Sequence, residues 1–142
     1  MTTGTSLRLQ DFEGRWSLSR VITDRRAGTT ARFDGSATFT PVAGALSYFE
    51  TGTLRIDGQP PIHAERRYLW RQDGDRIVIA FEDGREFHDF TATSPDASHW
   101  CDPDTYTVRY DFADWPIWTS TWQVSGPRKD YDMSTRYHRA AD

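Results

Sequence analysis

The stretch "GRWSLSRVI", residues 14–22, indicates the fold because apolar and polar residues alternate along it. Alternate side chains of a β-strand lie on the same face, so Trp16, Leu18 and Ile22 share one face. Arg20 lies on that face as well. A buried guanidinium is costly unless an opposite charge pairs with it. The stretch therefore predicts a strand that turns an arginine inward, and an interior that holds negative charge.

Turn signals divide the rest of the chain into short segments. Asp-Gly occurs at residues 34–35, 57–58, 73–74 and 83–84, and both residues tolerate the positive φ that tight hairpin turns need. Many short strands with regular turns are typical of a sandwich or an antiparallel barrel. Helical periodicity is absent apart from a single turn near "LRLQDF", and residues 23–34 form a polar link too short for a helical lid. The expected strands are 14–22, 35–41, 46–56, 63–71, 76–82, 85–91, 97–102, 106–112, 117–124 and 129–138.

Composition limits the classes of function. The 142 residues carry a net charge of −4, which argues against binding to nucleic acid or to an anionic membrane. Cys101 is the single cysteine, so no internal disulfide is expected. The first residues lack an apolar stretch of signal-peptide length, and no run has the ~20 apolar residues of a membrane span. We expect a cytoplasmic protein in which residues 1–142 form one domain; a homodimer is left open.

The alternation of side chains places charged groups among the residues expected inside. Glu50 shares a face with Tyr48, and Arg66 shares a face with Tyr68 and Trp70. The apolar faces must point inward, so they carry the charges with them. Further inward faces are expected on the later strands, with Tyr106, Val108, Tyr110 and Phe112 on one, and Trp118, Ser120, Trp122 and Val124 on the next. The sequence therefore predicts an aromatic interior that contains two arginines and one glutamate.

The hairpin "FEDGREFH", residues 81–88, decides where His88 points. A two-residue turn pairs Glu82 with Arg85 and places His88 on the face of Ile79 and Phe81. A one-residue bulge reverses that orientation, because the period of a strand is two. We expect the two-residue turn, with His88 inside.

The segment "GRW", residues 14–16, resembles the Gly-x-Trp signature that opens the first strand of calycins, the lipocalin-like barrels. In such barrels an arginine of the last strand packs over the Trp, and Arg136 matches that arginine here. A longer pattern resembles a small bacterial domain family of unknown function among these barrels, over roughly residues 10–138. It comprises "DFEGRW", "YFETG", "FEDGREFHDF", "HWCDPDTYTVRYDF" and "VSGPRKDY". The resemblance implies a single antiparallel lipocalin-like β-barrel of about ten strands, but it does not indicate an activity.

Two other groups of calycins differ from this sequence. Nitrobindin-like haem barrels open with Gly-x-Trp-x-Gly-x-Gly, but "GRWSLSR" lacks the later glycines, so the resemblance does not extend to haem. Fatty-acid-binding proteins have a helical lid, which the short 23–34 link excludes. The cofactor therefore stays unknown.

A metal site has few candidates. His99 and Cys101 lie on one face of the strand expected at 97–102, where His88 or Asp104 would complete a zinc or iron site. In the alternative interpretation, His99 forms a local hydrogen bond and Cys101 is a small apolar filler. A Cys–His nucleophile is disfavoured, because side chains two residues apart on a strand run parallel. We expect no metal, with His88, His99 and Cys101 as the weak candidates.

The interior charges predict a binding function. One carboxylate cannot match two guanidiniums, so we expect a partly apolar, anionic organic ligand in the barrel. The alternative is a lyase or isomerase that uses Glu50 with Tyr48 or Tyr68 as acid and base, by fold analogy with phenolic acid decarboxylases. A third interpretation is a structural barrel sealed by a Glu50 network between the arginines. The expected ligand-binding residues are Arg20, Tyr48, Glu50, Arg66, Tyr68, Trp70, His88 and Trp118.

Overall fold

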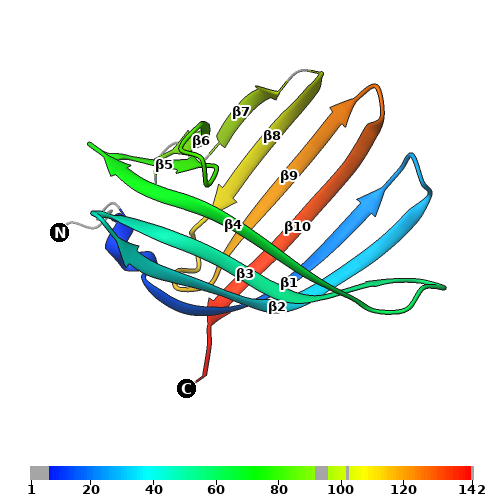
Figure 1. The fold of residues 1–142 in the computed structure, drawn as a ribbon, viewed down its shortest axis with the longest axis horizontal. Helices are drawn as coiled ribbons and strands as arrows, with labels where there is room; N and C mark the ends of the chain where they lie inside the picture. Colours follow the sequence, from blue (N-terminus) through cyan, green and yellow to red (C-terminus); the bar gives the residue numbers. More distant parts are fainter. Residues whose placement is uncertain (1–6, 92–95, 102, 142) are drawn as a thin grey trace.

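The computed structural model describes residues 7–91, 96–101 and 103–141, with the backbone alone for 96–101. A 3₁₀-helix, η1 (Leu9–Phe12), precedes ten strands in one sheet (Figure 1). The strands are β1 (Gly14–Asp24), β2 (Thr29–Val42), β3 (Ala45–Ile56), β4 (Ile62–Asp73), β5 (Arg76–Ala80), β6 (Glu86–Phe90), β7 (Asp96–Cys101), β8 (Asp104–Asp111), β9 (Trp118–Gly126) and β10 (Lys129–Arg139). Each expected strand has a counterpart, and the expected lipocalin-like fold is confirmed. Within the described residues, no helix has the length and apolarity needed to cross a membrane.

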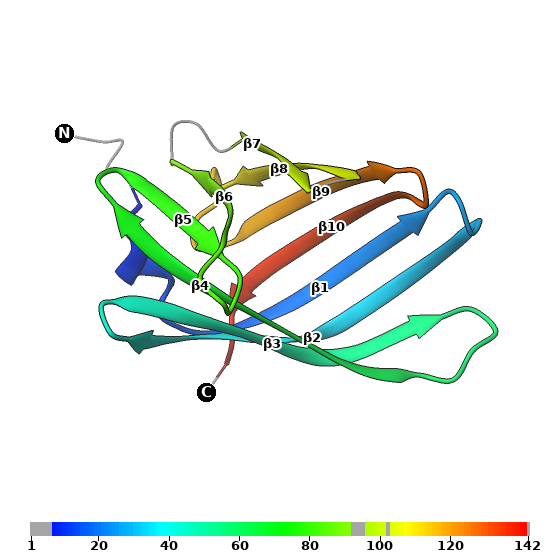
Figure 2. The same ribbon diagram turned by 45° about the horizontal axis from the view of Figure 1, so that its top comes forward.

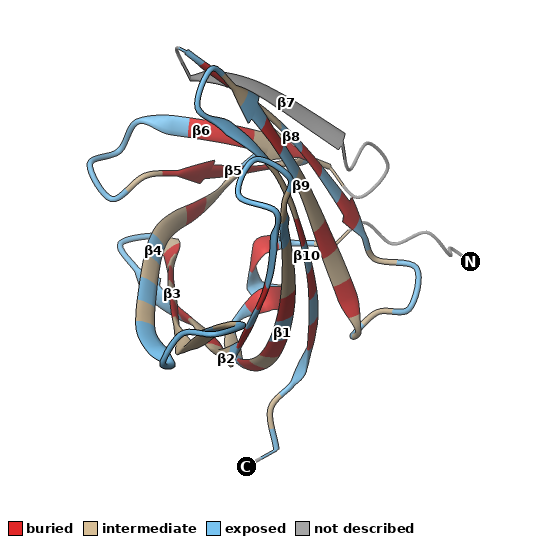
Figure 3. Cartoon of the chain, turned by 90° about the vertical axis from the view of Figure 1, so that its right-hand side faces the viewer, coloured by how far each residue is buried: buried red, intermediate tan, exposed pale blue. Residues whose placement is uncertain are grey.

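The sheet curls around a central interior. Its strand order is β6-β5-β4-β3-β2-β1-β10-β9-β8-β7, and all neighbouring pairs are antiparallel. The first and last strands of this order, β6 and β7, follow each other in the chain and contact each other. Figures 2 and 3 show the sheet wrapping round, and in Figure 3 buried residues alternate with more exposed ones along several strands. Inward side chains from distant parts of the chain therefore meet in one interior.

The polar segment 23–34 differs from the expectation. It is not a link but the end of one long hairpin, in which β1 continues to Asp24 and β2 begins at Thr29. The backbone ladder holds the polar tip of this hairpin together, and further along β2 the side chains of Ala31 and Phe33 are buried in the core. Beyond Asp24, Arg25 forms ion pairs with Asp130 at 2.7 Å and Asp132 at 2.8 Å.

Two glycines allow β2 and β3 to approach closely. Gly35 lies opposite Gly52 in the register. A Cβ atom on Gly35 would lie 2.1 Å from the carbonyl oxygen of Thr51, and one on Gly52 would lie 2.8 Å from a Phe33 ring carbon. No larger side chain fits without a backbone shift, which is typical of glycines at points where a sheet bends.

Helix η1 covers one end of the barrel with a packed aromatic cluster. Phe12 is fully buried, and its ring contacts those of Trp70, Trp115 and Trp118 at centroid distances of 5.3, 5.0 and 5.4 Å. The indole Nε1 of Trp16 donates a hydrogen bond to the Phe12 carbonyl at 2.9 Å. The first strand and the helix before it are thereby joined at this end.

The arginine over Trp16 is Arg139, not Arg136. The guanidinium carbon of Arg139 lies 3.9 Å from the centroid of the Trp16 ring, and the two residues are register partners. Its Nη atoms donate to the carbonyls of Glu13 at 2.9 Å and Asp11 at 2.6 Å. Arg136 is exposed, because residues of even number on β10 face outward. The predicted Trp16–Arg136 pair is therefore wrong by three residues, although the type of contact is present.

Candidate functional site

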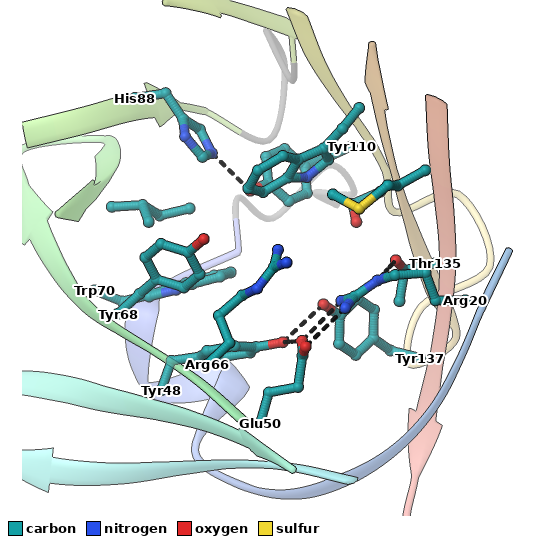
Figure 4. Close-up of a pocket in the computed structure, with 14 residues that line it drawn as sticks. Arg20, Tyr48, Glu50, Arg66, Tyr68, Trp70, His88, Tyr110, Thr135 and Tyr137 are labelled. Atoms are coloured by element: carbon teal, nitrogen blue, oxygen red, sulfur yellow. Dashed lines mark hydrogen bonds and ion pairs between the residues drawn. The ribbon is translucent and has the colours of Figure 1, made fainter. Parts of the chain in front are cut away.

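The inner cavity is a polar pocket inside the barrel, formed by strands from both halves of the chain. Its walls combine aromatic rings with two arginines, a glutamate and a histidine (Figure 4). Its free volume, meaning the space open to the centre of a water molecule, is about 30 Å³. One water needs about 10–15 Å³ on this measure, so the space suits a small head group. The lining residues are Arg20, Tyr48, Glu50, Arg66, Tyr68, Trp70, Ile79, His88, Tyr110, Ser120, Trp122, Met133, Thr135 and Tyr137.

Arg20 and Glu50 form a buried ion pair across strand β2. The Arg20 Nη1 and Nη2 atoms donate to the two Glu50 carboxylate oxygens, each at 2.7 Å. The Nε atom of Arg20 donates to Thr135 Oγ1 at 2.8 Å. The side chains of Arg20 and Glu50 are only 7% and 3% exposed. The expectation that Arg20 faces inward toward negative charge therefore agrees with the geometry.

Two tyrosines extend this pair into a chain of hydrogen bonds. The Tyr48 hydroxyl donates to Glu50 Oε1 at 2.6 Å. It lies 2.9 Å from the Tyr137 hydroxyl. Because the carboxylate only accepts, Tyr48 uses its hydrogen on Glu50 and accepts the hydrogen of Tyr137. Both oxygens of the Glu50 carboxylate are thus engaged, Oε1 by Arg20 and Tyr48 and Oε2 by Arg20.

The environment fixes the protonation states of this chain. Burial alone would raise the pKa of Glu50, but the hydrogen bonds and charge of Arg20 outweigh it and hold the pKa below its usual range. Burial raises the pKa of Tyr48 and of Tyr137 above the usual value. At neutral pH the group therefore consists of a cation, a carboxylate and two neutral phenols.

Arg66 reaches into the cavity without a carboxylate partner. It lies opposite Glu50 in the β3–β4 register, and Figure 4 shows its guanidinium directed into the pocket, away from Glu50. Among the residues that the structure describes, no carboxylate oxygen lies within 4.0 Å of its nitrogens. The guanidinium carbon is 5.8 Å from the centroid of the Trp122 ring. Arg66 is thus a cation in a largely aromatic pocket.

Tyr68 stands beside Arg66 on the same face of β4. Its ring lines the inner cavity, with the centroid 6.0 Å from that of Tyr48. Burial raises the pKa of Tyr68, and the charge of Arg66 partly opposes this effect. The neutral phenol and the guanidinium together offer hydrogen-bond donors to the same space.

His88 faces inward through two compensating shifts in its hairpin. The turn has three residues, because the Phe81 amide donates to the Arg85 carbonyl at 2.8 Å, so the expected pairing of Glu82 with Arg85 is wrong. A bulge follows, with a register shift between Ile79 and Ala80. The two one-residue shifts cancel, and His88 lies opposite Ile79 as expected.

His88 contacts Tyr110 at the far wall of the cavity from Glu50 (Figure 4). Its Nε2 atom lies 2.8 Å from the Tyr110 hydroxyl. Burial raises the pKa of Tyr110 well above its usual value. The bulge also leaves Phe87 buried next to His88, with ring centroids 4.5 Å apart. This wall therefore presents a histidine–tyrosine pair flanked by aromatic rings.

The structure brings most of the expected site residues together. Trp118 does not line the inner cavity, since its ring stacks on Tyr137 at a centroid distance of 3.8 Å and an angle of 8°. Tyr137 and Thr135 were not expected in the site, although the alternation of residues 131, 133, 135 and 137 along the last strand would have found them. The remaining expected residues all line the cavity: Arg20, Tyr48, Glu50, Arg66, Tyr68, Trp70 and His88.

Two of the three metal candidates, His99 and Cys101, cannot be placed relative to His88. The side chains of His99 and Cys101 lie outside the described residues. Asp104 is paired with Lys129 at 3.0 Å, and His88 contacts Tyr110. Where side chains are described, no group of three or more His, Cys, Asp or Glu residues is arranged to hold a metal ion.

Comparison with known proteins fits this architecture. The model of a family of unknown function, DUF6314, matches residues 12–139. The chain belongs to this family. The predicted resemblance to a small family of unknown function is thus confirmed. Among solved structures, the chain is similar to the S-type phycobiliprotein lyase CPES from Guillardia theta, with a TM-score of 0.64 and 12% identity over 94% of this chain and 91% of that one. A search of the curated proteins found no match.

Proposed function

We propose that this DUF6314 barrel binds a small, partly apolar organic anion, and that Arg66 is its anion contact. The observation that carries the proposal is the charge of the cavity. Arg20 and Arg66 bring two positive charges, and Glu50, already bonded to Arg20, brings one negative charge. Arg66 is half-buried in this largely aromatic pocket, and a bound carboxylate would pair with its guanidinium through bidentate hydrogen bonds.

The alternative functions fit the contacts less well. A lyase or isomerase that uses Glu50 needs a carboxyl able to exchange a proton near neutral pH, but both Glu50 oxygens are bonded to Arg20 and its pKa is lowered. A sealed structural network needs Glu50 to lie between both arginines, but among the described residues its carboxylate forms an ion pair with Arg20 and not with Arg66. The phycobiliprotein lyase is only 12% identical and supports the fold rather than a ligand.

Substitution of Arg66 tests the proposal. Arg66→Met keeps much of the side-chain volume and removes the charge, while Arg67→Met is the matched control, because Arg67 is exposed and packs over Phe49 on the other face at 4.1 Å. Native mass spectrometry and calorimetry would measure binding of trans-cinnamate and other carboxylates. We expect Arg66→Met to weaken binding at least tenfold, since hydrogen bonds to charged groups contribute about 1.5–3 kcal/mol.

The controls separate a lost contact from a lost fold. Circular dichroism should show the same strand signal for both variants and the parent. Equal binding by Arg66→Met and the parent would contradict the proposal, and so would a folded parent protein that binds none of the carboxylates.

A further inference from the structure

A second, outer cavity adjoins the inner one and shares part of its wall. The two cavities have Arg66, Tyr68 and Trp122 in common. The free volume of the outer cavity is about 220 Å³, against about 30 Å³ for the inner one. The other residues that line it are Phe81, Phe87, Tyr106 and Tyr131. The outer cavity therefore offers room for the body of a ligand whose head group lies in the inner cavity.

Aromatic rings make up almost the whole wall of the outer cavity. Phe81 and Phe87 stack with centroids 4.9 Å apart at 24°, and Phe87 meets the Tyr106 ring edge-on at 5.4 Å and 88°. Trp122 meets Phe87 at 5.3 Å and 64°. Such walls offer ring faces and edges in several directions, and aromatic pairs contribute attraction beyond the area they bury. Phe81, Tyr106 and Tyr131 are only partly buried, so the cavity opens toward solvent.

The outer cavity offers one positive charge to the part of a ligand that lies inside it. Of the described residues that line it, Arg66 is the one cation. Lys129, which contacts Tyr106, has its charge matched by Asp104 at 3.0 Å. A second anionic group on the ligand would therefore enter an aromatic cavity with no positive charge to pair with it, which is unfavourable.

We infer that the ligand is a planar aromatic monocarboxylate, with its carboxylate on Arg66 and its ring between the aromatic side chains of the outer cavity. The inference rests on the proposed function and adds the class of the ligand to it. Arg66, at the boundary of both cavities, holds the head group. The rings of Trp122 and Phe87 contact the body.

A matched set of ligands tests the inference. Calorimetry would compare trans-cinnamate, trans-3-cyclohexylacrylate and trans-cinnamamide, which differ in the aromaticity of the ring or in the charge of the head group. We expect cinnamate to bind about two- to tenfold tighter than the cyclohexyl acid, from the attraction between aromatic rings, and the amide to bind at least tenfold more weakly than cinnamate. Equal affinities of the two acids would overturn the inference and leave the proposed function standing. Failure of both acids to bind would count against the proposed function itself.

A pair of variants locates the ring. Trp122→Leu removes an aromatic wall of the outer cavity, whereas Phe49→Leu removes a ring on the opposite face, where Arg67 packs. We expect Trp122→Leu to abolish the preference for cinnamate over the cyclohexyl acid, and Phe49→Leu to retain it. An unchanged preference in a folded Trp122→Leu protein would contradict the placement of the ring.

Discussion

Replacement of Glu50 by glutamine would show how much stability is lost when Arg20 has no carboxylate partner in the interior. Glu50→Gln keeps the size of the side chain and removes the carboxylate that Arg20 binds through two hydrogen bonds of 2.7 Å. The guanidinium of Arg20 has a side-chain exposure of 7%, so bulk solvent does not compensate for the lost partner. The variant then holds two cations, Arg20 and Arg66, with no anion between them.

The expected loss is large. Breaking a buried ion pair by removal of one partner costs about 3–5 kcal/mol. Glutamine still offers one carbonyl acceptor, so we expect a value near the lower end, ~3 kcal/mol. For a chain of this length, that corresponds to a decrease in Tm of roughly 10 °C. Chemical denaturation followed by tryptophan fluorescence would measure the free energy of unfolding, with circular dichroism to check the fold.

Two comparisons make the result specific. Glu86→Gln breaks the exposed pair with Arg71, in which the side chains are 59% and 37% exposed, and we expect a loss below about 1 kcal/mol. The double variant Arg20→Met/Glu50→Gln removes both charges and should recover part of the stability lost in Glu50→Gln. A loss below about 1 kcal/mol in Glu50→Gln would refute the reasoning, because it would mean that Arg20 does not depend on its carboxylate.

Two further predictions concern the contact between Arg139 and Trp16 and the pH dependence of the Glu50 pair. Arg139→Ala removes the cation over Trp16 and should lower the free energy of unfolding by about 1–2 kcal/mol. The control Arg136→Ala, at an exposed position, should change it by less than about 0.5 kcal/mol. Equal effects of the two variants in chemical denaturation would contradict the assignment of Arg139 as the partner of Trp16. The pKa of Glu50 is lowered in the folded state, so its contribution is present above the unfolded-state pKa of about 4.3 and is lost as the pH falls through the folded value. The difference in unfolding free energy between the parent and Glu50→Gln should therefore shrink below about pH 4, and a constant difference down to pH 3 would contradict this.

Much of the site could be predicted from the alternation of side chains. The period of two placed Arg20, Glu50 and Arg66 on inward faces, because each sits on a strand whose neighbours at i±2 are apolar or aromatic. The Asp-Gly pairs at 57–58, 73–74 and 83–84 lie where strands turn, but the turn expected at Asp34-Gly35 is wrong, because both residues lie within β2. These signals are local, and the structure preserves them because a strand has only two faces.

The remaining contacts of the site depend on how strands pair, which the sequence of a single segment does not contain. Arg139 was missed because the resemblance pointed to Arg136, while the partner of Trp16 is decided by the β1–β10 register. The turn and the bulge around His88 each shift the register by one residue, and only the pairing with β5 shows that they cancel. Whether Arg20 or Arg66 pairs with the Glu50 carboxylate depends on how far these side chains extend from their strands across the interior. Sequence alternation does not specify that distance.

The orientation of a bound ligand tests the central claim most directly. A crystal of the protein with 4-bromocinnamate would locate the bromine by its anomalous scattering and the carboxylate by its electron density. The account predicts carboxylate oxygens within hydrogen-bond distance of the Arg66 guanidinium and bromine in the outer cavity, among Phe87, Tyr106 and Trp122. A ligand outside the barrel, or one whose carboxylate faces solvent while Arg66 has no anion, would contradict it.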